Sequence, residues 1–193
     1  LRALADLIAT LSDASFGNLG EAANSCGAAL LGVVPHRLPG GAESATLGVS
    51  SKEMLEQPRK AFVLFGLEPE LDCADPSIAR DALYDADFVV VFSGFLSAEM
   101  RAYANVVLPI AQFGENEGSY LNAAGVTQSF DAAVRPPGEA RPAWRVLRVL
   151  GNKTELDGFD YHSCEEVRAE FIGFVPQQLP LEKPYRSHPP PLW

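Results

Sequence analysis

Apolar and polar positions along this chain follow two patterns, one typical of helices and one typical of buried strands. Residues 1–12 repeat leucine and isoleucine at helical spacing, which predicts an amphipathic helix. Residues 61–65, 88–92 and 106–108 are short apolar runs, each stopped by glycine, serine or proline. Such runs are typical of strands in a parallel sheet that is covered on both faces.

Further helices are predicted between and around these strands. The segments expected to be helical are residues 18–31, 52–57, 76–84, 98–104, 143–150 (ended by Gly151) and 163–171. In the helix after Asp75, proline occupies the first position, and Ile78, Ala82 and Leu83 are predicted to be buried. The many small residues of segment 18–31 favour close packing against a neighbouring element over the alternative, a nucleotide-facing helix.

Strand, helix, strand, helix, strand at short spacing predicts a right-handed parallel unit. We therefore predict an α/β fold with a parallel, Rossmann-like sheet and flanking helices. Residues 1–152 are predicted to form this domain, incomplete at its N-terminal side because the early helices have no strand between them. Residues 153–193 are predicted to be a C-terminal extension with one short helix and an extended proline-rich arm, since residues 176–193 contain six prolines.

Composition limits the possible partners. The 193 residues have a net charge of -10, with 25 acids against 15 bases, which argues against nucleic acid as a partner. No apolar run is long enough to cross a bilayer, so direct membrane insertion is not expected. Cys26, Cys73 and Cys164 lie far apart and form no C-x-x-C motif, so this chain alone cannot assemble an iron–sulfur cluster or a structural zinc site. We expect reduced, buried thiols in a reducing compartment.

Few side chains by themselves indicate a catalytic, binding or metal site. Glu115 and Glu117 could act as a paired acid and base, or could simply be solvated loop residues. His36-Arg37, at the start of a long loop, could contact an anion or be a solvated basic pair. No G-x-G-x-x-G follows the first strand, which disfavours a stand-alone nucleotide-binding module. The residues alone predict an α/β domain without a visible catalytic or metal site.

The chain begins at Leu1 and has its first methionine at position 54, which indicates a piece of a longer protein. Three of its segments, PRKAFVLFGLEPELD, NVVLPIAQFGENEGSYLNAAGVTQSF and PPGEARPAWRVLRVLGN, resemble the molybdopterin-oxidoreductase superfamily. More narrowly, they resemble the large iron–sulfur subunit of NADH-quinone oxidoreductase, respiratory complex I. The runs EAANSCGAALLG, MLEQPRKA and FDYHSCEEVRAE also fit that subunit, so the resemblance covers nearly the whole chain, as the C-terminal part of that subunit.

This resemblance implies a non-catalytic structural domain. The iron–sulfur clusters are expected in the N-terminal region of the subunit, which this chain lacks. The parent complex would transfer electrons from NADH to quinone, coupled to proton translocation. The implied partners are other peripheral-arm subunits of complex I, and the implied location is peripheral, on the cytoplasmic side of the bacterial inner membrane.

The resemblance also points to an old cofactor site in the segment from residue 105 to residue 130. In cofactor-binding relatives, the loop after the first strand and an E-G-T-x-x-N-x-E-G-R-x-Q segment lie close to the pterin dinucleotide. The matching positions here are Gly66, Glu68, Pro69, Glu117, Gly118, Asn122, Gly125 and Gln128. Ala124 stands where an acid is frequent and Val126 where an arginine is, and without the arginine a bidentate donor to phosphate is missing. We therefore expect a vestigial site without molybdopterin.

The alternative is the cofactor-binding domain of a molybdopterin enzyme of the formate dehydrogenase type. In that case Glu117, Gly118 and Asn122 would line a phosphate or guanine pocket.

Overall fold

The computed structural model describes residues 2–17, 20 and 22–174. The predicted proline-rich arm, residues 176–193, lies outside the described residues. The elements in chain order are α1 (Arg2–Ser12), α2 (Ser25–Leu30), α3 (Ser51–Glu56), β1 (Ala61–Phe65), α4 (Pro69–Asp72), α5 (Pro76–Tyr84), β2 (Phe88–Ser93), α6 (Ala98–Tyr103), β3 (Val106–Pro109), the 3₁₀ turn η1 (Phe113–Glu115), β4 (Gly118–Leu121), β5 (Thr127–Phe130), α7 (Ala143–Lys153) and α8 (Cys164–Phe174).

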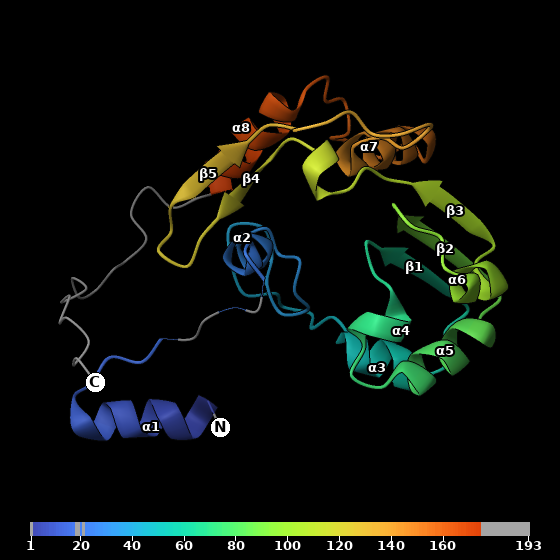
Figure 1. Ribbon diagram of the computed structural model, residues 1–193. Helices are drawn as coiled ribbons and strands as arrows, with labels where there is room; N and C mark the ends of the chain where they lie inside the picture. Colours follow the sequence, from blue (N-terminus) through green and yellow to red (C-terminus); the bar gives the residue numbers. More distant parts are fainter. Residues whose placement is uncertain (1, 18–19, 21, 175–193) are drawn as a thin grey trace, which may run out of the picture.

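The three predicted strands form one parallel sheet with the order β1-β2-β3. Val63 lies beside Val90, and Phe92 lies between Phe65 and Leu108. Helices α3 to α6 lie on one side of this sheet and α7 lies on the other (Figure 1). The predicted α/β fold with a parallel sheet and flanking helices is confirmed.

The main hydrophobic core lies between the sheet and helices α5 and α6. Its buried members are Phe62, Leu64, Leu83, Val89, Val91, Met100 and Tyr103. Ala79 and Leu83, four residues apart on α5, face the sheet and are fully buried. The prediction that Ile78 is buried is wrong, because Ile78 points toward a surface cleft between α3 and α5 and is 37% exposed.

The prediction that the first strand is covered on both faces is also wrong. Phe62 and Leu64 are buried, but Ala61, Val63 and Phe65 point to the opposite face and are exposed.

Two other predicted elements differ in length. The small-residue helix begins only at Ser25, and its predicted start at residue 18 lies outside the described residues. The prediction that Gly151 ends its helix is wrong, since α7 continues to Lys153, and the ring of Phe159 lies against the backbone at this glycine.

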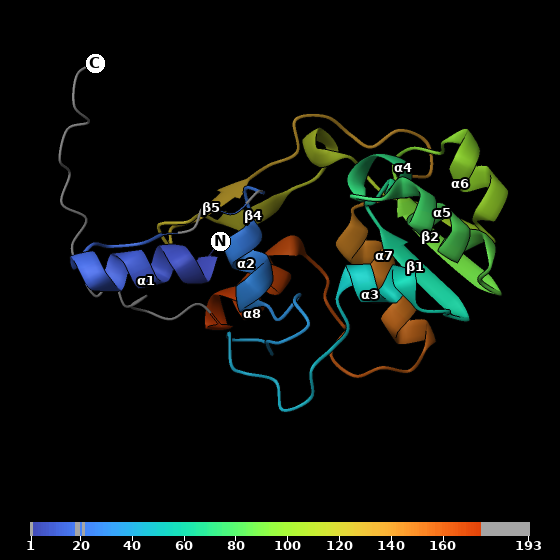
Figure 2. The same ribbon diagram turned by 90° about the horizontal axis from the view of Figure 1, so that it is seen from below.

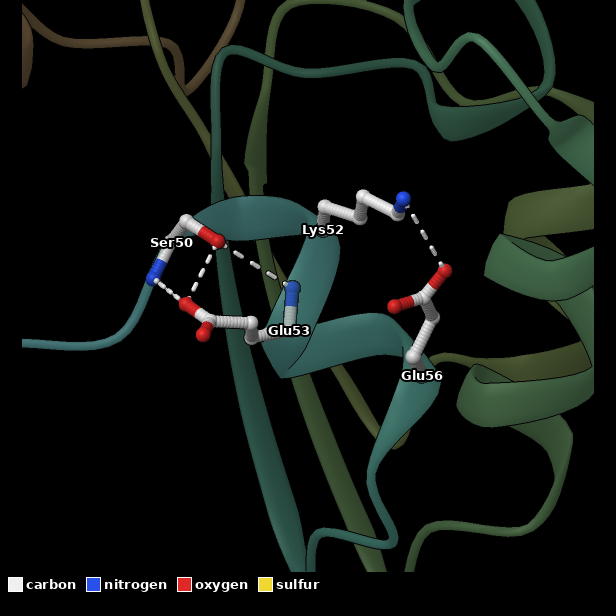
Figure 3. A network of polar contacts seen from close by, with 4 residues as sticks. All are labelled: Ser50, Lys52, Glu53 and Glu56. Atoms are coloured by element: carbon white, nitrogen blue, oxygen red, sulfur yellow. Dashed lines mark hydrogen bonds and ion pairs between the residues drawn. The ribbon is translucent and has the colours of Figure 1, made fainter.

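Helix α3 has a complete capping box, which supports a helix of only six residues. Ser50 Oγ accepts a hydrogen bond from the Glu53 amide at 3.3 Å, and the Ser50 amide donates to Glu53 Oε2 at 2.9 Å. The same carboxylate accepts from Ser50 Oγ, and these bonds lower the pKa of Glu53 (Figure 3). Lys52 and Glu56 form an ion pair at 3.6 Å on the exposed side. The helix predicted at residues 52–57 is confirmed to within one residue at each end.

The segment after β3 forms an antiparallel hairpin, β4–β5, with Tyr120 opposite Gln128. The rings of Phe113, Tyr120 and Phe130 pack together with centroids 5.0–6.1 Å apart. Helices α2 and α8 lie beside this hairpin in both views (Figures 1 and 2). The hairpin therefore joins an early and a late part of the chain. Among the described residues, no helix is long and apolar enough to span a membrane.

Candidate functional site

The predicted site residues fall into two groups. Gly66 and Glu68 follow β1, at the end of the parallel sheet where the strands terminate. Gly66 has a positive φ of 60° and donates its amide to the Phe92 carbonyl at 2.8 Å. The Glu68 amide donates to Asp72 Oδ2 at 2.7 Å, and the buried Pro69 begins α4. These backbone amides are therefore engaged by the chain itself.

The second group lies in and around the hairpin. Gly118 begins β4, and a Cβ atom at this position would lie 2.8 Å from the Phe130 ring. The Glu117 carbonyl accepts a hydrogen bond from the Cys164 thiol at 3.9 Å. Gln128 is exposed on β5. Glycine at 118 is thus explained by the packing of an aromatic ring, without any ligand.

Asn122 organises the turn that joins the two strands. Its side-chain Oδ1 accepts hydrogen bonds from the amides of Ala124 and Val126, both at 3.0 Å. Its backbone amide donates to the Val126 carbonyl at 3.1 Å, and Gly125 has a φ of 78°. The turn closes on itself, and Val126 is exposed at its end.

The structure does not bring the two groups together. In both views the hairpin lies apart from the end of β1 where Gly66 and Glu68 are found (Figures 1 and 2). It does bring together Glu117, Gly118, Asn122 and Gln128, all within or next to the hairpin.

A cavity of about 340 Å³ lies between α2, the following loop and the hairpin turn. Its lining residues are Cys26, Ala29, Leu30, Arg37, Gly41, Leu121, Asn122, Ala123 and Gly125. This volume is at the low end of the range for small-molecule pockets, roughly 300–1,000 Å³. The only charged residue in the lining is Arg37, which donates to the Gly41 carbonyl at 3.3 Å and pairs with Glu43 at 3.5 Å. The candidate anion contact is therefore occupied by a carboxylate of the same loop.

Sequence reasoning missed that α2 forms one wall of this cavity. Asn24 Oδ1 accepts a hydrogen bond from the Leu121 amide at 2.9 Å and so fixes α2 to β4. The small residues of α2 were the available signal, because they favour close approach to a neighbouring element.

The two acidic candidates lie in different local structures. Glu115 ends the 3₁₀ turn, where its Oε2 accepts a hydrogen bond from the Gln112 amide at 2.8 Å. Glu117 precedes β4, so the two carboxylates do not share one face of a strand. Within residues 2–17, 20 and 22–174, no group of three His, Cys, Asp or Glu side chains could hold a metal ion.

Tyr103 is a buried titratable group close to the loop after β1. Burial, and then the nearby carboxylate of Glu70 on α4, raise the pKa of Tyr103 well above its usual range. Its hydroxyl therefore stays protonated and cannot act as a base at neutral pH.

The three thiols differ in environment, and this gives a prediction for their reactivity. Cys26 is exposed at the cavity wall, which corrects the expectation of uniformly buried thiols. Burial raises the pKa of Cys164 and of Cys73, and neighbouring carboxylates raise both further. Because each pKa unit changes the thiolate fraction about tenfold, a thiol reagent at pH 7.5 should modify Cys26 first and Cys164 last. Mass spectrometry at timed intervals measures the order.

The control for this labelling is the unfolded chain, in which all three thiols should react at similar rates. Raising the pH should reduce the difference in labelling rate between the three thiols of the folded chain, because the pH then approaches the raised pKa values of Cys73 and Cys164 and their thiolate fractions increase. Equal rates for Cys164 and Cys26 in the folded chain would contradict the prediction.

The fold and the hairpin define a parallel α/β domain with an appended β-hairpin, and a small open pocket lies between α2 and the hairpin turn. Residues 3–153, most of the chain, match the molybdopterin oxidoreductase family. The chain belongs to the molybdopterin oxidoreductase family, and the superfamily part of the sequence-based prediction is confirmed.

Individual relatives include subunits of larger enzymes. The alpha subunit of the F420-dependent formate dehydrogenase of Methanocaldococcus jannaschii is 32% identical over 134 residues, which are 67% of this chain and 20% of that protein. The mitochondrial 78 kDa subunit of the NADH-ubiquinone oxidoreductase of Candida albicans is 30% identical over 106 residues, 55% of this chain and 14% of that protein. The chain thus spans a fifth or less of the length of these curated relatives.

The acetylene hydratase of Pelobacter acetylenicus has a similar fold. It matches with a TM-score of 0.51 and 21% identity over 71% of this chain and 20% of that structure. This likeness supports the α/β fold and carries no information about activity.

Proposed function

We propose that this chain is a structural domain, without its own cofactor, of the iron–sulfur subunit of an NADH-quinone oxidoreductase of the complex I type. The observation that carries the proposal is the hairpin turn. Asn122 uses its side-chain oxygen to close the turn, and Val126 stands where the cofactor-binding motif has arginine. A valine cannot donate hydrogen bonds to a phosphate, so the turn lacks the group that would neutralise a dinucleotide.

In this proposal the electron-transfer chemistry lies outside residues 1–193. The chain has three cysteines without C-x-x-C spacing, so the iron–sulfur clusters would be held by another region of the subunit. The domain would contact other peripheral-arm subunits, on the cytoplasmic side of the bacterial inner membrane. The complex would transfer electrons from NADH to quinone and couple this to proton translocation. Two relatives are named as subunits of larger enzymes, which supports the proposal that this domain has partner subunits.

A second candidate is the cofactor-binding domain of a molybdopterin enzyme of the formate dehydrogenase type. The relatives favour it, because the formate dehydrogenase subunit matches a larger share of this chain, 67% against 55%, at slightly higher identity. Here Gly66, Glu68, Glu117, Gly118, Asn122 and Gln128 would be the candidate cofactor contacts. In that case these residues would bind the cofactor, and the site would not be vestigial as in the first candidate.

Metal and pterin analysis of the purified full-length protein separates the two candidates. The first predicts iron but neither molybdenum, tungsten nor pterin above background. One molybdenum or tungsten atom per protein, together with bound pterin, would overturn it in favour of the second candidate.

The second candidate makes its own prediction about the hairpin. Asn122→Ala should then reduce the cofactor content, whereas Asn152→Ala, the same substitution at an exposed position of α7, should not. An unchanged cofactor content in both variants would remove Asn122 from the proposed contacts.

A further inference from the structure

Strand β1 has a hydrogen-bonded neighbour on one side only within the described residues. The Phe88 amide donates to the Lys60 carbonyl at 3.1 Å, and the Gly66 amide donates to the Phe92 carbonyl at 2.8 Å. In a parallel pair, alternate residues of a strand bond to the same neighbour. These two bonds therefore show that the even-numbered residues of β1 bond to β2. The amides and carbonyls of Ala61, Val63 and Phe65 point to the free edge.

The same three residues also expose their side chains. Val63 is 67% exposed and Phe65 is 47% exposed, on the sheet face opposite the main core. Free edge strands are usually protected by a charged side chain, a proline or a bulge within the strand. The run AFVLF contains none of these. This free edge of β1, residues 61, 63 and 65, thus combines unpaired backbone groups with exposed apolar side chains.

The opposite edge of the sheet, at β3, is paired with another segment of the chain. Just beyond β3, Ile110 and Arg141 form a parallel bridge. The Ala111 amide donates to the Arg141 carbonyl at 2.9 Å, so another segment of the chain lies along this edge. Among the described residues, β1 is therefore the edge of the parallel sheet that has no hydrogen-bonded neighbour on its outer side.

We propose that the free edge of β1 pairs with a further β-strand, supplied by the part of the same polypeptide outside residues 1–193. Only an extended backbone can pair with the amides and carbonyls of Val63 and Phe65 in register, and parallel sheets are normally buried on both faces. The source is indicated by length, because the chain spans about a fifth of the formate dehydrogenase subunit and less of the 78 kDa subunit. The complementary strand is apolar and about the length of β1, five residues. The inference holds for either candidate function.

Hydrogen exchange resolved at single amides tests this proposal in the full-length protein and in residues 1–193. The Val63 and Phe65 amides should exchange rapidly in residues 1–193 and at least about a hundredfold more slowly in the full-length protein. The amides of Phe62 and Leu64, which face β2, should be protected in both and serve as the internal control. Rapid exchange of Val63 and Phe65 in the full-length protein would overturn the proposal. Protection in residues 1–193 that increases with protein concentration would also overturn it, in favour of a second copy as the partner.

A charged substitution gives an independent test. Val63→Lys should leave the melting temperature of residues 1–193 unchanged, because the side chain is exposed there, and should lower that of the full-length protein. Val33→Lys is the matched control, since Val33 is similarly exposed (72% against 67%) but lies outside the sheet, and it should change neither melting temperature. A full-length protein whose melting temperature is unchanged by Val63→Lys would count against an apolar strand paired beside β1.

Discussion

Replacing Leu83 by alanine is expected to lower the free energy of unfolding of this chain by about 2–5 kcal/mol. Leu83 is only 1% exposed, and from α5 it faces the sheet in the cluster that contains Phe62, Val89 and Met100. Removing its side chain deletes apolar contacts and leaves a cavity that closely packed neighbours fill only in part. Urea unfolding followed by circular dichroism measures the loss.

Ile78→Ala is the matched control on the same helix. It removes a similar volume from a side chain that is 37% exposed, so we expect a loss of about 1 kcal/mol or less. Equal losses for the two variants would contradict the orientation of α5, with Leu83 toward the sheet and Ile78 toward solvent.

Gly151→Ala should also destabilise the chain, by about 1–3 kcal/mol, although alanine is normally the better helix former. A Cβ atom at position 151 would overlap the ring of Phe159, which packs directly on the α7 backbone. The overlap involves the root of the ring and not a flexible end, so either the ring or the helix must move. Thermal and urea unfolding of the variant measure the cost.

Gly173→Ala provides the comparison, because this glycine also lies in a helix, α8, but has open space where a Cβ atom would be. There the substitution should stabilise the chain by up to about 1 kcal/mol, through helix propensity alone. Opposite signs for the two variants are the expected result. Stabilisation by both would show that Phe159 does not constrain Gly151.

The strands could be predicted well because their signal is local. Ala61–Phe65 is a continuous apolar run bounded by charged residues and glycine, and the observed strand has these bounds. Exposure on one face could not be predicted, because it depends on which elements pack above the sheet. The prediction of which side chains of α5 are buried was wrong for a similar reason. Ile78 and Ala79 are neighbours about 100° apart around the helix, and a small rotation exchanges their environments.

The candidate site was less predictable from sequence. The resemblance grouped Gly66 and Glu68 with Asn122, but the structure places them in two separate regions. The closure of the turn by Asn122 follows a local rule for asparagine and could have been anticipated. The contact between Asn24 and Leu121 could not, because nothing in either segment specifies a partner so distant in sequence.

The bond from the Leu121 amide to Asn24 has a consequence for the order of folding. It joins positions 97 residues apart, whereas the strands of the parallel sheet are joined by connections of fewer than about 25 residues. Closing a longer loop costs more chain entropy, so distant contacts tend to form after local ones. We therefore expect the sheet to form first and α2 to dock on the hairpin late, so that Asn24 would influence the rate of unfolding more than the rate of folding.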